Sequence, residues 1–220
     1  MAAMTTTPAA GTSAAGATTS SATTTTYSPQ DAFARIRSRL SDQAFLEGKG
    51  LGNEVPFFIH PYDARAELEV RRLTQELLDA SRANEIPARV VHFDLWEVFL
   101  DICRARNVLE KIPQLEKRRG TDALLDSIGR FATPEAFVQA MDTRYQEGFG
   151  GPEPGRDVVL VSGVGKAYPL MRAHSILENA QPVFTDVPLV MLYPGSYDGQ
   201  RLRLFGSIDD GNYYRAFSLM

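Results

Sequence analysis

Four short apolar runs, separated by segments with helical periodicity, are the feature of this sequence that most constrains its fold. The runs cover residues 55–60, 89–94, 157–162 and 188–193. Continuous apolar runs of this length are typical of strands buried on both faces of a parallel sheet. Between the first two runs, residues 63–83 repeat apolar side chains at helical spacing, which indicates a βαβ unit. We therefore predict an α/β fold with a mainly parallel sheet flanked by helices, Rossmann-like and with a P-loop-like topology that lacks an intact P-loop.

The predicted strands are joined by connections of very different length. Residues 95–147 form a helical insertion between the second and third strands, longer than a single crossover helix requires. This insertion is expected to form a lid or a docking arm, or to cover one face of the sheet. A helix over 168–180 should join the third and fourth strands. Near the C-terminus, residues 201–208 and 213–219 flank an Asp-Asp-Gly-Asn turn, a pattern that predicts an antiparallel hairpin.

Composition divides the chain into a tail and a domain. Residues 1–27 carry no charge and consist mostly of Thr, Ala and Ser. Such a segment buries too little apolar surface to offset its ordering entropy, so we predict a disordered low-complexity tail. Residues 28–220 should form a single α/β domain, beginning with a helix that Ser28 caps and Pro29 starts.

Charge and cysteine content exclude several classes of protein. The net charge of −4 does not favour a nucleic-acid or membrane-surface binder, and the basic run 117–119 is interpreted as a solvated helix end. Cys103 is the single cysteine, which excludes an internal disulfide and any zinc site with several thiolates. We therefore expect no metal and no cofactor. The lack of disulfides favours the cytoplasm, and no apolar run approaches the roughly 20 residues of a membrane span.

Polar residues gather where the predicted strands end. The ends carry His60, Tyr62 and Asp63; then Asp94; then residues 162–166; and then Tyr193, Gly195, Tyr197 and Asp198. Open parallel sheets bind ligands beyond the carboxyl ends of their strands. These groups are therefore expected to converge on one edge of the sheet.

The turn Gly163-Val164-Gly165-Lys166 follows an apolar strand, as a phosphate-binding loop does. Leu160 stands where a P-loop has its first glycine, and Ala167 stands where it has a hydroxyl for magnesium. Two interpretations remain. Gly163, Gly165 and Lys166 bind a nucleotide or nucleic acid, or the glycines allow a tight turn with close packing.

The three histidines do not form a metal-binding pair, because no two are separated by two or four residues. His92 alternates with apolar residues in a strand, which indicates a hydrogen-bonded core histidine. His60 stands at a strand end and is the one histidine placed for a pocket, where it could act with Asp63 or Asp94 in a hydrolase. No serine stands in the G-x-S-x-G pattern of a nucleophile elbow. We expect a binding protein rather than an enzyme.

Aromatic and basic residues alternate in the last third of the chain. The candidates for partner binding are Tyr193, Tyr197, Arg201, Tyr213, Tyr214 and Arg215. Tyr and Arg are enriched at the energetic centres of protein interfaces. Stacking on nucleic-acid bases and packing beneath the hairpin are the alternative uses of these side chains.

Several strings of the sequence resemble one family. They are GKGLGNEVPF at 48–57, SGVGKAYP at 162–169, LYPGSYDGQ at 192–200, LFG at 204–206 and DGNYYRAF at 210–217. Together they resemble the BrxB family of bacteriophage exclusion (BREX) systems over residues 28–220. The strings at 193–200 and 212–217 are long enough to be specific.

The resemblance implies a role in phage defence beside a methyltransferase, a large ATPase and PglZ, a protein of the alkaline-phosphatase superfamily. It implies a small, non-catalytic subunit that binds PglZ and other BREX proteins. Contact with nucleic acid is then expected only through the complex, and contact with membranes is not expected. The family supplies no catalytic residue to carry over.

Overall fold

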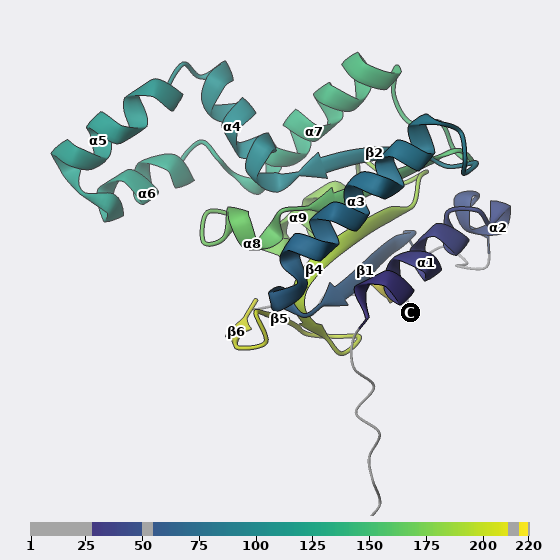
Figure 1. Cartoon of the computed structure of the whole chain (residues 1–220). Helices are drawn as coiled ribbons and strands as arrows, with labels where there is room; N and C mark the ends of the chain where they lie inside the picture. Colours follow the sequence, from purple (N-terminus) through teal and green to yellow (C-terminus); the bar gives the residue numbers. More distant parts are fainter. Residues whose placement is uncertain (1–27, 50–54, 211–215, 220) are drawn as a thin grey trace, which may run out of the picture.

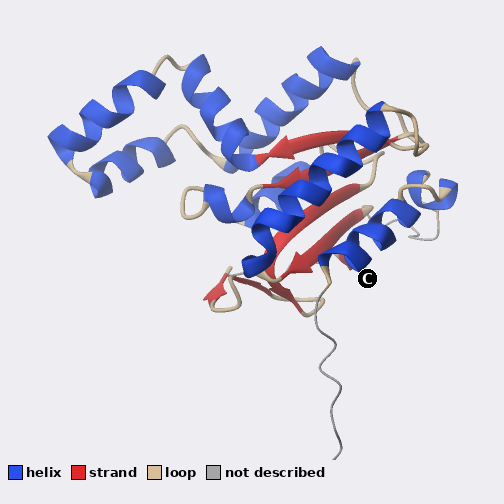
Figure 2. Cartoon of the chain, in the orientation of Figure 1, coloured by secondary structure: helices blue, strands red, loops and turns tan. Residues whose placement is uncertain are grey.

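The computed structural model describes residues 28–49, 55–210 and 216–219, so the predicted tail lies outside the described residues. A sheet lies between two layers of helices (Figures 1 and 2). Its strands are β2 (Arg89–Asp94), β3 (Asp157–Ser162), β4 (Leu189–Tyr197), β1 (Phe57–Tyr62) and β7 (Phe217–Ser218), in that order across the sheet. All of these neighbours pair in parallel, which confirms the predicted α/β fold.

One face of the sheet is covered by helices from the first part of the chain. These are α1 (Pro29–Arg39), α2 (Gln43–Leu46) and α3 (Glu67–Arg82), the last preceded by a 3-10 turn, η1 (Ala64–Ala66). As predicted, the Ser28 hydroxyl caps α1, accepting the Asp31 N–H at 3.3 Å. The apolar stripe of α3, including Val70, Leu73 and Leu77, packs on this face.

The opposite face is covered by α4 (Leu95–Ala105), α7 (Pro134–Phe149), α8 (Val164–Ala167) and α9 (Ala173–Ala180). Helices α4 and α7 are the two ends of the predicted insertion and pack on each other. Between them lie η2 (Leu109–Lys111), α5 (Ile112–Arg119) and α6 (Thr121–Gly129). Helices α5 and α6 extend beyond the sheet in Figure 1. The insertion therefore covers one face with its ends and projects with its middle.

A buried ion pair joins the amino ends of β2 and β3. The Arg89 guanidinium donates two hydrogen bonds of 2.6 Å to Asp157, whose side chain is fully buried. The Tyr145 hydroxyl of α7 and the Glu153 N–H also donate to this carboxylate, at 2.7 and 2.9 Å. Asp157 therefore ties the edge strand β2, the strand β3 and the helix α7 together.

The structure corrects the predicted helix over 168–180. Helix α8 begins directly after β3 and ends at Ala167, and α9 begins only at Ala173. Pro169 lacks a backbone N–H and restricts Tyr168 to extended backbone, so one continuous helix is not possible here. Tyr168 has ψ 139°, as this restriction requires.

The predicted C-terminal hairpin exists, but its turns lie elsewhere. Strand β5 (Leu202–Leu204) pairs antiparallel with both β4 and β6 (Ile208–Asp209). From the second predicted arm, β7 instead pairs in parallel with β1, and the predicted turn residues 211 and 212 lie outside the described residues. Asp210 is buried, and its carboxylate accepts the N–H of Ala173 at 3.2 Å, so its side chain caps α9. Among the described residues, no helix is long and apolar enough to cross a bilayer.

Candidate functional site

The carboxyl ends of the strands meet at one edge of the sheet. A small cavity of about 120 Å³ is lined by Tyr62 of β1, by His92 and Asp94 of β2, and by Ser162 and Leu192 of the next two strands. A broader groove of about 650 Å³ lies over β1 and β4 and is lined by residues 61–65, 195–197 and 205–206. Part of the predicted strand-end set therefore lines two neighbouring hollows, whereas His60, Lys166, Tyr193 and Asp198 line neither.

The turn after β3 is closed by an ion pair. The Lys166 ammonium pairs with Oδ2 of Asp94, across from the end of β3 to the end of β2. Oδ1 of Asp94 accepts the N–H of Trp96 at 3.0 Å and caps α4. The one cation of the turn is therefore engaged within the protein.

The two glycines of this turn have different structural roles. Gly163 has a φ of +75°, and a Cβ there would lie 2.4 Å from Oδ1 of Asp94. Gly165 has an ordinary φ, but a Cβ there would lie 3.0 Å from the ring of Phe205 and 3.2 Å from Pro194. These contacts favour the packing interpretation of the turn. That Gly163, Gly165 and Lys166 bind a ligand stays a prediction.

His92 and Ser162 form a pair that sequence reasoning missed. The imidazole Nε2 lies 2.8 Å from the Ser162 hydroxyl, at the ends of neighbouring strands. Burial lowers the pKa of His92, so its imidazole is neutral near pH 7. The strand ends therefore hold two engaged pairs, His92 with Ser162 and Asp94 with Lys166.

The structure does not favour the hydrolase alternative, in which His60 acts with Asp63 or Asp94. His60 is 1% exposed and packs edge-on against Phe33 of α1, so the expectation that it faces a pocket is wrong. Asp63 bonds the Arg65 guanidinium, and Asp94 is held by Lys166. His60 points beneath α1 because Phe58, His60 and Tyr62 alternate onto the face that α1 covers.

Replacing His60 by Asn should reduce the acid sensitivity of folding. Burial, and secondarily the charge of Arg35, lower the pKa of His60 from 6.5 to about 4. Below pH 6.5 the unfolded chain binds a proton at His60 that the folded chain does not bind. The free energy of unfolding therefore decreases as the pH is lowered. Between pH 7 and pH 5 His60 should account for about 2 kcal/mol of this loss. Urea titrations at both pH values measure it, and equal losses in wild type and His60→Asn would contradict the prediction.

The predicted partner-binding residues are placed very differently from one another. Tyr193 is fully buried, so it is not a surface anchor, and burial raises the pKa of its hydroxyl. The Tyr197 hydroxyl donates to the carbonyl of Ala216 at 2.7 Å and accepts its N–H at 3.2 Å, which ties β4 to the segment before β7. Arg201 is exposed on the turn between β4 and β5. The remaining three, Tyr213, Tyr214 and Arg215, lie outside the described residues.

Comparison with known proteins places the chain in a family. The BrxB family model, described as "BREX protein BrxB", matches residues 91–219. A protein of that name from Bacillus cereus (strain H3081.97) is 37% identical over 189 residues, which cover 84% of this chain and 94% of the relative. Another from Escherichia coli O9:H4 (strain HS) is 30% identical over 187 residues, covering 85% and 89%. No solved structure matches the chain.

The family model covers more than half of the chain, and both relatives align along most of their own length. The strings at 162–169, 192–200 and 210–217, which carried the resemblance in the sequence, all lie within the matched residues. The chain therefore belongs to the BrxB family of BREX proteins.

Proposed function

We propose that this member of a BREX phage-defence system is a non-catalytic, protein-binding subunit whose direct partner is the PglZ-like protein of the same system. Membership of a BREX system implies partners among the other BREX proteins. The finer proposal rests on the polar groups at the carboxyl edge of the sheet, where an α/β enzyme of this topology would keep its reactive side chains.

The observation that carries the proposal is the ion pair between Lys166 and Asp94. A catalytic lysine or carboxylate at this edge needs a free side chain that can reach a substrate. Here each neutralises the other, and Asp94 also caps α4. This ion pair thus links the ends of β2 and β3 and supports the start of α4.

The sequence left open a nucleotide- or nucleic-acid-binding module at the same turn. Gly163 lies against Asp94, and Gly165 lies against Phe205, so the turn is filled from both sides. Phosphate would have to displace Asp94 from Lys166 and leave that carboxylate beside the incoming anion. The contacts therefore count against phosphate binding at this turn.

The test is a binding experiment with purified proteins of one BREX system. This chain and the PglZ-like protein should elute together on size exclusion and form a complex measurable by calorimetry. The methyltransferase and the large ATPase, each tested alone, serve as comparison partners. Separate elution of this chain from all of them would contradict the proposal.

The same preparation should be incubated with ATP and with an oligonucleotide, and its melting temperature measured. We expect no shift in either the wild type or Lys166→Ala. A stabilisation by ATP that disappears in Lys166→Ala would replace the proposal with the nucleotide-binding alternative.

A further inference from the structure

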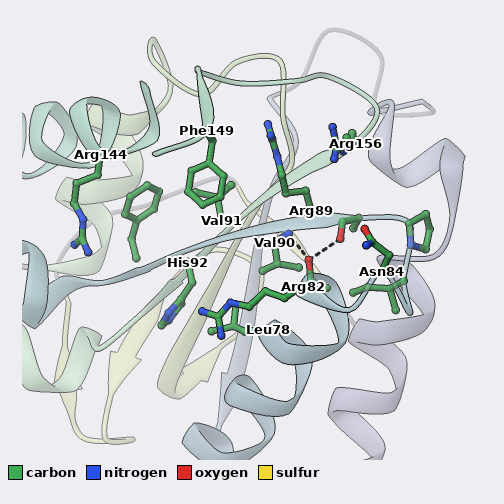
Figure 3. Close-up of a pocket in the computed structure, with 15 residues that line it drawn as sticks. Leu78, Arg82, Asn84, Arg89, Val90, Val91, His92, Arg144, Phe149 and Arg156 are labelled. Carbon is green, nitrogen blue, oxygen red and sulfur yellow. Dashed lines mark hydrogen bonds between the residues drawn. The ribbon is translucent and has the colours of Figure 1, made fainter. Parts of the chain in front are cut away.

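Strand β2 is an edge of the sheet and lies at the bottom of a groove. Among the described strands it pairs only with β3. The groove has a volume of about 540 Å³ and runs along β2 between the C-terminal turns of α3 and α7. Figure 3 shows Leu78, Arg82 and His92 on one side of this strand and Arg144 and Phe149 on the other.

The backbone of β2 is protected at its amino end but not beyond it. The Arg89 N–H donates to Arg156 at 2.8 Å on the β3 side, so the alternate residues Val90 and His92 direct their backbone groups into the groove. The Ser81 hydroxyl accepts the Val90 N–H at 2.9 Å and donates to the Ala88 carbonyl at 2.8 Å. Within the described part of the chain, the Val90 carbonyl and both backbone groups of His92 have no partner. An edge with such groups is a template for another strand.

The groove has a positive lining. It contains Arg82, Arg89, Arg144 and Arg156 and no carboxylate side chain. Three of these arginines pair with acids outside the lining: Arg82 with Asp79, Arg144 with Asp101 and Arg156 with Glu153. All six side chains of these pairs are at least 36% exposed, and exposed pairs hold weakly and exchange readily. These guanidiniums can therefore turn to an acidic ligand without a large loss.

One apolar side chain completes the groove. Phe149 at the end of α7 is 43% exposed, and the Arg89 guanidinium lies 5.4 Å from its ring centre. A large aromatic ring left this exposed offers contact area for an apolar side chain of a ligand. The lining thus combines backbone donors and acceptors, positive charge and an apolar anchor.

We propose that the groove along β2 binds an extended, acidic segment of a partner protein, which adds to the sheet as a further strand. In this mode of recognition the backbone supplies hydrogen bonds, and alternate side chains supply specificity. Acidic side chains of the segment would reach Arg82 on one side and Arg144 on the other. This inference rests on the proposed function, because it names the surface through which a BREX partner is held.

Two other occupants fit the charges poorly. A second copy of β2 would bring the same arginines against those already in the groove. The residues 1–27 of the chain itself contain no Asp or Glu, so they offer nothing to the arginines. An acidic segment of another protein is the occupant that matches both the open backbone and the charge.

The experiment uses the full-length chain and the purified PglZ-like protein, with affinity measured by calorimetry. His92→Pro removes the free N–H and places a ring where the added strand would lie, and proline is tolerated in edge strands at such positions. His92→Ala is its matched control, because it removes the imidazole and keeps the N–H. We expect at least a tenfold weaker affinity for His92→Pro and a clearly smaller loss for His92→Ala, because only the proline variant removes the backbone donor.

A second variant tests the charges and does not alter the strand. The double variant Arg82→Glu/Arg144→Glu should weaken the affinity at least tenfold. Arg72→Glu/Arg118→Glu, which makes the same change in net charge on exposed residues outside the groove, should not. Circular dichroism checks folding, and if His92→Pro unfolds, the charge-reversal pair decides the question.

The possible outcomes are distinct. A partner that binds the wild type and all variants equally overturns the groove but leaves the proposed function intact. If Arg201→Glu loses binding and the groove variants do not, the interface lies in the C-terminal region. This outcome also contradicts the proposal that the groove along β2 binds the partner. A single-stranded oligonucleotide that needs Arg82 and Arg144, beside unaffected protein binding, assigns the groove to nucleic acid instead. A wild-type chain that binds no BREX protein refutes the proposed function itself.

Discussion

Asp157→Ala should lower the free energy of unfolding by about 3–5 kcal/mol, one of the two largest losses we expect from a single substitution in this chain. The carboxylate is fully buried and accepts from Arg89, from the Tyr145 hydroxyl and from the Glu153 N–H. Without it, a guanidinium that is 23% exposed loses its main counter-charge, and a buried hydroxyl loses its acceptor. Urea-induced unfolding followed by circular dichroism measures the loss.

Two milder variants show which part of the network matters. Tyr145→Phe removes one donor and should cost only about 1 kcal/mol. Asp157→Asn keeps an acceptor for the hydroxyl but removes the charge, so its loss should fall between the other two. If Asp157→Ala costs less than Tyr145→Phe, the ion pair does not stabilise the junction of β2, β3 and α7.

Gly195→Ala should destabilise the fold by about 3 kcal/mol and loosen the C-terminal hairpin. A Cβ at Gly195 would lie 2.1 Å from the carbonyl oxygen of Arg203 in β5 and 3.0 Å from the ring of Tyr193. The first of these atoms belongs to the backbone, and the second belongs to a fully buried ring, so neither can move without disrupting pairing or packing. Strand β5 must therefore separate from β4.

Limited proteolysis should detect this separation as faster cleavage between residues 198 and 210, and thermal unfolding should give the stability. Gly129→Ala is the matched control, since a Cβ there meets nothing within 4 Å and φ is not positive. That control should leave both measurements near those of the wild type. Equal cleavage rates in Gly195→Ala and Gly129→Ala would show that β5 accommodates the methyl group.

The sequence predicts β2 and β3 with their observed bounds. Both are short, mainly apolar runs with polar residues at their ends, so local pattern alone defines them. The stripe of α3 follows for the same reason. The order of the strands could not be predicted, because β1 pairs with β4, more than 120 residues away, through contacts that no local pattern encodes.

The position of the candidate site could be predicted from the sequence, but the side-chain pairs within it could not. Strand-end polar residues do gather at one edge, as the topology of parallel sheets requires. The pairs themselves join His92 to Ser162 and Asp94 to Lys166, across 70 and 72 residues of chain. Tyr193 shows the same limit, since its aromatic ring is equally consistent with an interface and with a core until the packing partners are known.

The helical insertion leaves the sheet at the carboxyl end of β2 and returns at the amino end of β3. An ion pair lies at each of these two junctions. Asp94 and Lys166 form the pair at the junction where the chain leaves β2, and Arg89 and Asp157 form the pair where the chain enters β3. Helices α5 and α6 lie away from the sheet, in the stretch of chain between these two ion pairs. We therefore expect changes of length or charge within α5 and α6 to leave the register of the strands undisturbed.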